Sequence, residues 1–177
     1  MYLRGLEKED LQYLHKLMND EEVMELARFR PDHMISMEGL EKEYEDELKQ
    51  ESGHRRTFII VDNQSSKPIG WASMRWWRPF STSTELGIAI GEKDHRGKGV
   101  GTEVVGLLTD LAFDQYNMHK AEMFTRQTNR AMLGAAEKNG YKVEGVLRET
   151  IYFNGKYHDG VMLGLLRSER TSKIPKA

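Results

Sequence analysis

The sequence predicts a single domain of the α/β or α+β class, with helices covering a central sheet. Its 177 residues suit one domain with one sizeable core. Stretches that alternate with a period of two are interspersed with stretches whose apolar residues recur at helical spacing. No repeat, low-complexity segment or linker divides the chain. We expect the domain to span residues 1–167 and a polar, frayed tail to span 168–177.

The N-terminal third is expected to hold a short strand and two helices. The strand covers residues 2–5, and Glu9 or Asp10 caps the first helix. A polar stretch with Pro31 leads to a second helix begun by Ser36. The apolar faces of the two helices are formed by Leu11, Leu14, Leu17 and Met18, and by Leu40, Tyr44 and Leu48.

The rest of the chain reads mainly as strands. Predicted strands cover residues 57–61, 69–77, 120–125 and 141–147, with a turn at 62–66, a loop at 78–83 and a helix at 131–138. Residues 150–166 form a hairpin around Asn154-Gly155, a strong two-residue turn signal.

The most informative segment is the glycine-rich run from Asp94 to Gly101. It follows a strand pattern at Leu86, Ile88 and Ile90 and precedes a helix pattern that begins at Val100. Glycines at such a junction leave backbone N–H groups uncovered, and these groups together with the helix N-terminus suit a phosphate or pyrophosphate. Arg96 and Lys98 add positive charge. The alternative is a tight strand–helix connection without a ligand.

The spacing of this run separates it from two other nucleotide motifs. Neither the P-loop pattern nor the dinucleotide fingerprint is present. Arg96, Gly99 and Gly101 instead match the pattern R/Q-x-x-G-x-G/A. This pattern resembles the acetyl-CoA pyrophosphate loop of the GNAT acetyltransferase superfamily.

The resemblance covers roughly residues 55–166 and, less specifically, the N-terminal third of the chain. Residues 85–91 are similar to the strand that precedes the loop in the family, and Asn129 with Asn139-Gly140-Tyr141 to its N…A…GF segment. Residues 144–149 and 152–159 resemble the branch of ribosomal-protein and spermidine N-acetyltransferases. The resemblance implies a mixed, mostly antiparallel sheet of about seven strands, splayed at the cofactor site, with about four helices on its faces.

The resemblance also implies where acetyl-CoA binds as co-substrate. The pantetheine arm is expected beside Ile88, Ala89 and Ile90, where a backbone N–H would stabilise the oxyanion. Asn129 would contact the cofactor, although a helix cap is the alternative. The pyrophosphate would be held by Arg96, Gly97, Lys98, Gly99, Val100 and Gly101.

Acetyl transfer to an amine also requires a base. Glu85 begins the cofactor-side strand and is the candidate, acting through a water; the alternative is a solvated strand-end residue. Relatives often carry a tyrosine as general acid seven residues after the asparagine, but here that position is Ala136. Tyr141 is expected to fill a buried aromatic slot, so no general acid is assigned.

Several other residues lie where the acceptor is expected. Of Trp76 and Trp77, one ring should face the core, and the other could line the acceptor pocket with Phe29. The acidic cluster Asp20, Glu21, Glu22 and Glu25 could attract a cationic amine, but a solvated face is the ordinary alternative. Asp159 is expected to be structural.

Composition excludes some classes of function. The net charge of −2 shows no basic surface for nucleic acid, and no apolar run is long enough to span a membrane. The absence of cysteine excludes a thiolate nucleophile and fits a reducing, cytoplasmic compartment, and no histidine spacing indicates a metal site.

We therefore predict an N-acetyltransferase that acts by direct attack in a ternary complex with acetyl-CoA. The acceptor is a small-molecule amine or a protein N-terminus, and a homo-oligomer is compatible with this interpretation. The alternatives are a polyamine acetyltransferase of the spermidine type and a non-catalytic acyl-CoA-binding module. The sequence does not identify the amine.

Overall fold

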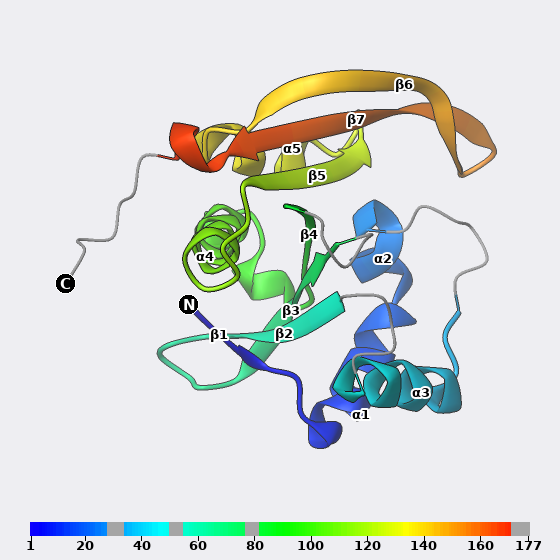
Figure 1. Cartoon of the computed structure of the whole chain (residues 1–177). Helices are drawn as coiled ribbons and strands as arrows, with labels where there is room; N and C mark the ends of the chain where they lie inside the picture. The colour runs from blue at the N-terminus through cyan, green and yellow to red at the C-terminus, as the bar shows by residue number, and fades with distance from the viewer. Residues whose placement is uncertain (28–33, 50–54, 77–81, 171–177) are drawn as a thin grey trace.

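Seven strands form one mixed sheet in the order β1-β2-β3-β4-β5-β7-β6 (Figure 1). The computed structural model describes residues 1–27, 34–49, 55–76 and 82–170. All neighbouring strands are antiparallel except β4 and β5, which pair in parallel. The strands are β1 Tyr2–Gly5, β2 Arg55–Val61, β3 Pro68–Arg75, β4 Ser83–Ile90, β5 Lys120–Arg126, β6 Lys142–Phe153 and β7 Lys156–Leu166.

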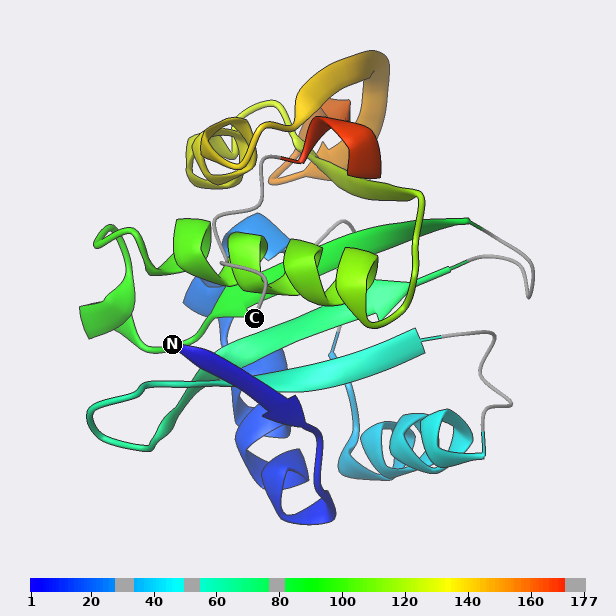
Figure 2. The same cartoon turned by 60° about the vertical axis from the view of Figure 1, so that its left-hand side comes forward.

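Five α-helices within the described residues flank this sheet, where the sequence predicted about four. They are α1 Leu11–Met18, α2 Glu21–Ala27, α3 Met37–Leu48, α4 Val100–Asp114 and α5 Arg130–Lys138. Figure 2 shows α4 in front of the sheet and α1 behind it. The predicted mixed, mostly antiparallel sheet of seven strands is confirmed.

Local signals explain where most helices begin. The Ser36 hydroxyl accepts a hydrogen bond from the Gly39 N–H at 3.0 Å and begins α3, as predicted. Asp10 is the N-cap residue of α1, and its carboxylate pairs with the Arg4 guanidinium of β1 at 2.6 Å. That ion pair attaches the first strand to the first helix.

The additional helix is α2, which the sequence pattern did not predict. The Asp20 carboxylate accepts a hydrogen bond from the Val23 N–H at 3.0 Å and so caps the helix. Among its described side chains, Met24 is buried and Val23 and Ala27 are partly buried, so the apolar stripe of this seven-residue helix is too short to reveal it. The acidic cluster therefore begins a helix instead of lying in a polar loop.

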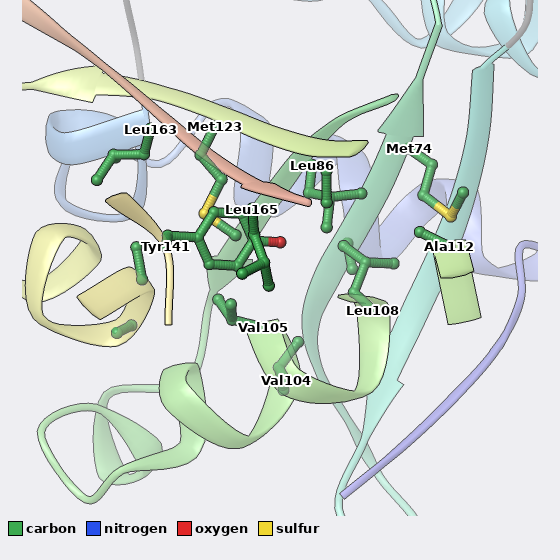
Figure 3. Close-up of a cluster of buried hydrophobic side chains, with 14 of the residues drawn as sticks. Met74, Leu86, Val104, Val105, Leu108, Ala112, Met123, Tyr141, Leu163 and Leu165 are labelled. Carbon is green, nitrogen blue, oxygen red and sulfur yellow. The ribbon is translucent and has the colours of Figure 1, made fainter. Parts of the chain in front are cut away.

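Two hydrophobic clusters pack on opposite faces of the sheet. The larger one lies between the sheet and α4 and α5, and it contains Leu86, Leu108, Met123, Tyr141 and Leu165 (Figure 3). The smaller one lies between the sheet and α1, α2 and α3. Since side chains alternate along a strand, β4 places Leu86 on the α4 face and Ala89 on the α2 face.

The C-terminal hairpin differs from its predicted outline. β6 is one strand of 12 residues, and the irregularity predicted as a break is a bulge between Leu147 and Ile151. After β7, the chain remains part of the fold: residues 167–169 form a short 3-10 helix, and the Arg170 guanidinium bonds to Asp110 at 2.8 Å. Of the expected tail, residues 171–177 lie outside the described part of the chain.

Candidate active site

The sheet opens between β4 and β5. Only three residue pairs join these strands, from Ser83↔Lys120 to Glu85↔Glu122. Beyond Glu85, β4 continues to Ile90 and β5 continues to Arg126 without pairing to each other. In Figure 1 the half of the sheet containing β1–β4 diverges from the half containing β5–β7, and α2 lies at the open end. The predicted splay at the cofactor site is therefore present.

The backbone of β4 presents free groups to this opening. The Gly91 N–H donates to the Ile69 carbonyl of β3 at 2.8 Å. Because backbone groups alternate in direction along a strand, Ala89 also points its N–H and C=O toward β3, whereas Ile88 and Ile90 point theirs into the opening. Of the three residues predicted to line the pantetheine arm, Ile88 and Ile90 thus direct their N–H groups into the opening, and the predicted oxyanion contact stays a prediction.

The loop between β4 and α4 has the backbone geometry of an anion site. Gly97 and Gly99 adopt left-handed conformations, with φ of +73° and +84°. Within the described chain, the N–H groups of residues 97–99 donate to no acceptor. Residues 100–102 form the first turn of α4, where N–H groups have no partner within the helix. The ladder of α4 begins with the bond from the Glu103 N–H to the Gly99 carbonyl at 3.0 Å. Consecutive uncovered N–H groups at a helix N-terminus suit a pyrophosphate.

The two cations of this loop have different surroundings. The Arg96 guanidinium donates to the Ile90 carbonyl at 3.0 Å and to the Gly91 carbonyl at 2.7 Å, and it pairs with Glu22 of α2 at 2.9 Å. Arg96 is therefore occupied in joining the end of β4 to α2. Lys98 is exposed and makes no hydrogen bond or ion pair with a described residue. The cation available for a phosphate is Lys98.

Asn129 caps α5. Its amide oxygen accepts from the Met132 N–H at 3.1 Å, and its amide nitrogen donates to the Thr125 hydroxyl at 3.1 Å. The side chain is buried. The capping role considered for Asn129 is thus present in the structure, and its predicted contact with the cofactor stays a prediction.

Glu85 lies at the closed end of the opening. On the sheet it is next to Arg75 of β3 and Glu122 of β5, so its side chain shares their face, the one covered by α2. Glu122 is neutralised by Lys120 at 2.9 Å, and Lys120 also binds Glu144. Glu85 is partly exposed and forms no hydrogen bond or ion pair with any described residue. It is therefore the carboxylate at this end that is available to take a proton.

The position of the missing general acid lies in the core. Ala136 is fully buried in α5 and packs in the larger cluster. Tyr141 is also buried, and its hydroxyl lies 2.7 Å from the Thr109 hydroxyl of α4. Burial raises the pKa of Tyr141 above its usual value. These contacts support the expected structural role of Tyr141.

The remaining residues predicted near the acceptor either form structural contacts or lie outside the described residues. Trp76 packs its ring against the larger core and Tyr116, 5.8 Å between centroids, whereas Trp77 and Phe29 lie outside the described residues. Lys93 and Arg96 both bind Glu22 and hold its pKa below the usual range, so this member of the acidic cluster is occupied. Asp159 accepts the Glu149 N–H at 2.9 Å, which is a structural role.

Arg126, the last residue of β5, was missed because the predicted strand ended one residue earlier. It is 2% exposed and shares the Glu85 face. The signal available in the sequence was that Arg126 falls on the same side of the strand as the polar residues Lys120 and Glu122.

A pocket of about 400 Å³ lies between α1, α3, β2 and β3. Its lining combines leucine side chains with three carboxylates and two arginines: Leu6, Leu14, Met18, Leu40, Glu43, Tyr44, Asp46, Glu47, Arg55, Thr57 and Arg75. Glu47 accepts hydrogen bonds from the backbone and the hydroxyl of Thr57, at 2.7 and 2.9 Å. Arg75 connects the pocket to the closed end of the opening, because it pairs across the strands with Glu85.

No group of three or more His, Cys, Asp or Glu side chains in the described part of the chain could hold a metal ion. None of the described helices is long and apolar enough to cross a membrane.

Comparisons with known proteins agree with this geometry. Residues 1–142 match the family model of the acetyltransferase (GNAT) domain. The chain is 28% identical over 167 residues to a spermidine N(1)-acetyltransferase from Vibrio cholerae, covering 94% of this chain and 93% of the relative. It is 27% identical over 175 residues to a probable N-acetyltransferase, YjcK, from Bacillus subtilis, covering 96% and 95%.

A shorter match and a solved structure complete the comparison. A putative ribosomal N-acetyltransferase from Bacillus subtilis, YdaF, is 31% identical over 100 residues, covering 56% of this chain and 54% of the relative. The crystal structure of the Vibrio cholerae spermidine N-acetyltransferase in complex with CoA and spermine superposes with a TM-score of 0.85 at 28% identity, covering 95% and 96% of the two chains. With its splayed sheet and uncovered glycine loop, this chain belongs to the GNAT acetyltransferase family and is an acetyl-CoA-dependent N-acetyltransferase.

Proposed function

We propose that this enzyme acetylates the primary amine of a small molecule by direct attack in a ternary complex. The observation that carries the proposal is the opening between β4 and β5. Glu85 lies at its closed end without a partner among the described residues, and the backbone groups of Ile88 on β4 point into it. The absence of cysteine in the sequence supports direct attack, since no thiolate can carry the acetyl group. It also supports a cytoplasmic location.

Acetyl-CoA supplies the activated acetyl group as a thioester. Its pyrophosphate would lie on the N–H groups of residues 97–101 with Lys98 beside it, and its pantetheine arm would follow the free edge of β4. The exposed edge provides backbone donors and acceptors, as an additional strand would require. In this assignment, the predicted cofactor residues with free backbone groups contact acetyl-CoA. Arg96 and Asn129, whose side chains already form hydrogen bonds within the protein, hold neighbouring segments in place.

The transfer then uses this chain's own groups. Glu85 removes a proton from the ammonium through a water, which is needed because an ordinary primary amine has a pKa of about 10.4. The amine nitrogen forms a bond with the thioester carbonyl carbon, and the Ile88 N–H stabilises the oxygen that becomes negative. The carbon–sulfur bond breaks, the nitrogen loses its second proton to a water, and that water passes a proton to the departing thiolate. A thiol pKa of about 8.5 makes the thiolate a good leaving group without a general acid.

Two acceptor classes and one non-catalytic role are the alternatives. Spermidine acetyltransferases among the relatives and the carboxylates Glu43, Asp46 and Glu47 of the pocket favour a polyamine. The ribosomal relative favours a protein N-terminus. A non-catalytic acyl-CoA-binding module would lack turnover with every acceptor.

A pair of variants tests the role of Glu85. We expect Glu85→Gln to lower kcat/KM by about 100-fold near neutral pH, with recovery as pH rises toward the amine pKa, because a general base contributes about 10²–10⁴. Glu122→Gln is the matched control, since this neighbouring carboxylate is already bound to Lys120. Release of the CoA thiol with a panel of amines measures both variants.

The outcomes separate the alternatives. Equal activity of Glu85→Gln and Glu122→Gln at every pH would make Glu85 a structural residue. Binding of acetyl-CoA by calorimetry without turnover of any amine would support the acyl-CoA-binding module instead of the enzyme.

A further inference from the structure

Arg126 is a buried cation without an acidic partner among the residues that the structure describes. Its Nη2 donates to the Glu25 backbone carbonyl of α2, and its Cζ lies 3.8 Å from the centroid of the Phe153 ring of β6. Its Nε is buried and has no hydrogen-bond partner, and no described carboxylate lies within ion-pair distance. Burial lowers the pKa of Arg126, and the nearby charge of Glu25 only partly opposes this.

Three partly buried arginines of this fold are neutralised by carboxylates. Arg4, Arg96 and Arg170 each bind a carboxylate at 2.6 to 2.9 Å. A buried charge with unfilled donors is costly, because neither water nor an anion replaces the hydration that it loses. Arg126 thus has hydrogen-bond donors available for an anionic group that none of the described residues supplies.

Arg126 lies on the same face of the sheet as Glu85, the proposed base, and therefore on the side where the amine is proposed to bind. Side chains on β5 alternate, so Arg126 shares a face with Glu122 and hence with Glu85. It follows Glu122 by four residues, about 13 Å along the strand, while Ile88 follows Glu85 by three, about 10 Å. Arg126 therefore lies across the opening from the β4 segment just beyond the Ile88 N–H.

Helix α2 closes this side of the opening. Glu22 of α2 binds Arg96, which is itself hydrogen-bonded to the end of β4. The Glu25 carbonyl accepts from Arg126 at the end of β5, so one turn of α2 is held at the ends of both strands. Figure 1 shows α2 at that open end. The guanidinium of Arg126 therefore lies where α2 meets the sheet.

We propose that Arg126 binds the acceptor through a carboxylate, so that the preferred substrates carry a primary amine at one end and a carboxylate at the other. Amino acids with terminal amines and acidic peptides have this chemistry, whereas polyamines present a second cation to Arg126. A guanidinium suits a carboxylate because its planar donors can bind both oxygens. This inference rests on the proposed transfer to small amines and concerns which amine is selected.

The test uses acceptor pairs that differ by one carboxylate. These are 4-aminobutyrate with butylamine, 6-aminohexanoate with hexylamine, and lysine with cadaverine, with spermidine as the polycation. We expect the full-length enzyme to prefer at least one carboxylated member by about 10-fold or more in kcat/KM, the scale of a hydrogen-bonded charge. Arg126→Gln should remove that preference, and Arg126→Lys should keep part of it. Arg148→Gln, which removes an exposed arginine of β6, should retain it.

A purely structural role for Arg126 predicts a different result. It would lower kcat/KM for both members of each pair alike in Arg126→Gln, and such a parallel loss would overturn the proposal. A wild-type preference for the member without the carboxylate, or for spermidine, would overturn it too, while leaving acetyl transfer to amines intact. If no amine of the panel is acetylated although acetyl-CoA binds, the proposed function itself fails.

Discussion

The hydroxyl of Tyr141 offers a sharp test of whether this enzyme uses a tyrosine as general acid. Thr109 donates its hydroxyl hydrogen to the Val105 carbonyl at 2.7 Å, so its oxygen accepts from Tyr141 at 2.7 Å. Tyr141→Phe removes this donor and leaves Thr109 with one remaining bond. A buried neutral hydrogen bond contributes about 1 kcal/mol, so the melting temperature should fall by about 2–4 °C for a domain of this size.

Catalysis should respond differently from stability. Because the Tyr141 hydroxyl points to α4 in the core, we expect kcat and the affinity for acetyl-CoA to change by less than about 2-fold, below the scale of general-acid catalysis. Thermal unfolding and a kcat profile against pH measure the two effects. Loss of most of the activity together with an alkaline limb, at an unchanged melting temperature, would refute the structural role. It would make Tyr141 a displaced general acid.

Tyr141 also affects stability at high pH. Burial raises its pKa in the folded state, and burial with the nearby Glu92 raises that of Tyr13. The unfolded value is about 10, so the stabilisation is present below about pH 10 and is lost as pH rises beyond it. Tyr141→Phe should therefore flatten the decline of stability above about pH 10, which denaturant unfolding at several pH values would show. An unchanged slope would contradict this assignment.

The remaining predictions concern the glycine loop. Gly99→Ala and Gly155→Ala both place a side chain at a left-handed residue, with φ of +84° and +75°, so both should lose about 1–2 kcal/mol of stability. Only Gly99→Ala should weaken acetyl-CoA binding in calorimetric titration, since its side chain enters the space above the uncovered N–H groups; equal affinities would exclude the pyrophosphate site. Lys98→Gln should weaken binding and reduce its salt dependence, whereas Arg96→Gln should chiefly lower the melting temperature, because its guanidinium already binds Ile90, Gly91 and Glu22. The reverse pattern in titrations at two salt concentrations would make Arg96 the phosphate ligand.

Strong local signals made most of the fold predictable. The alternation through Leu86, Ile88 and Ile90 and the cap at Ser36 correspond to β4 and α3. Helix α2 was missed because one of its faces is held by polar contacts, Glu22 with Arg96 and Glu25 with Arg126, instead of a stripe of apolar residues. Such contacts span about 75 to 100 residues of chain and leave no local pattern.

The candidate site was predictable at the level of the backbone and less so at the level of side chains. Gly97 and Gly99 are glycines because the turn requires left-handed residues, a requirement that the sequence displays directly. The partners of Arg96 and Asn129 depend on tertiary packing, which the sequence does not display. The charge of Arg96 and the amide of Asn129 therefore led to predicted ligand contacts, whereas in the structure both side chains form hydrogen bonds within the protein. Their roles toward acetyl-CoA stay predictions.

The short junction between β4 and β5 has a consequence for the order of events. Three residue pairs and the packing of α4 hold two half-sheets together, so the protein alone has an interrupted hydrogen-bond ladder. A co-substrate that lies along β4 would complete this ladder and stiffen the junction before an amine arrives, which favours acetyl-CoA as the first substrate to bind. Hydrogen exchange of the β4 and β5 amides should then slow on addition of acetyl-CoA and stay fast with the acceptor alone. Bound in this way, the substrate would be a temporary structural element of the sheet on which it reacts.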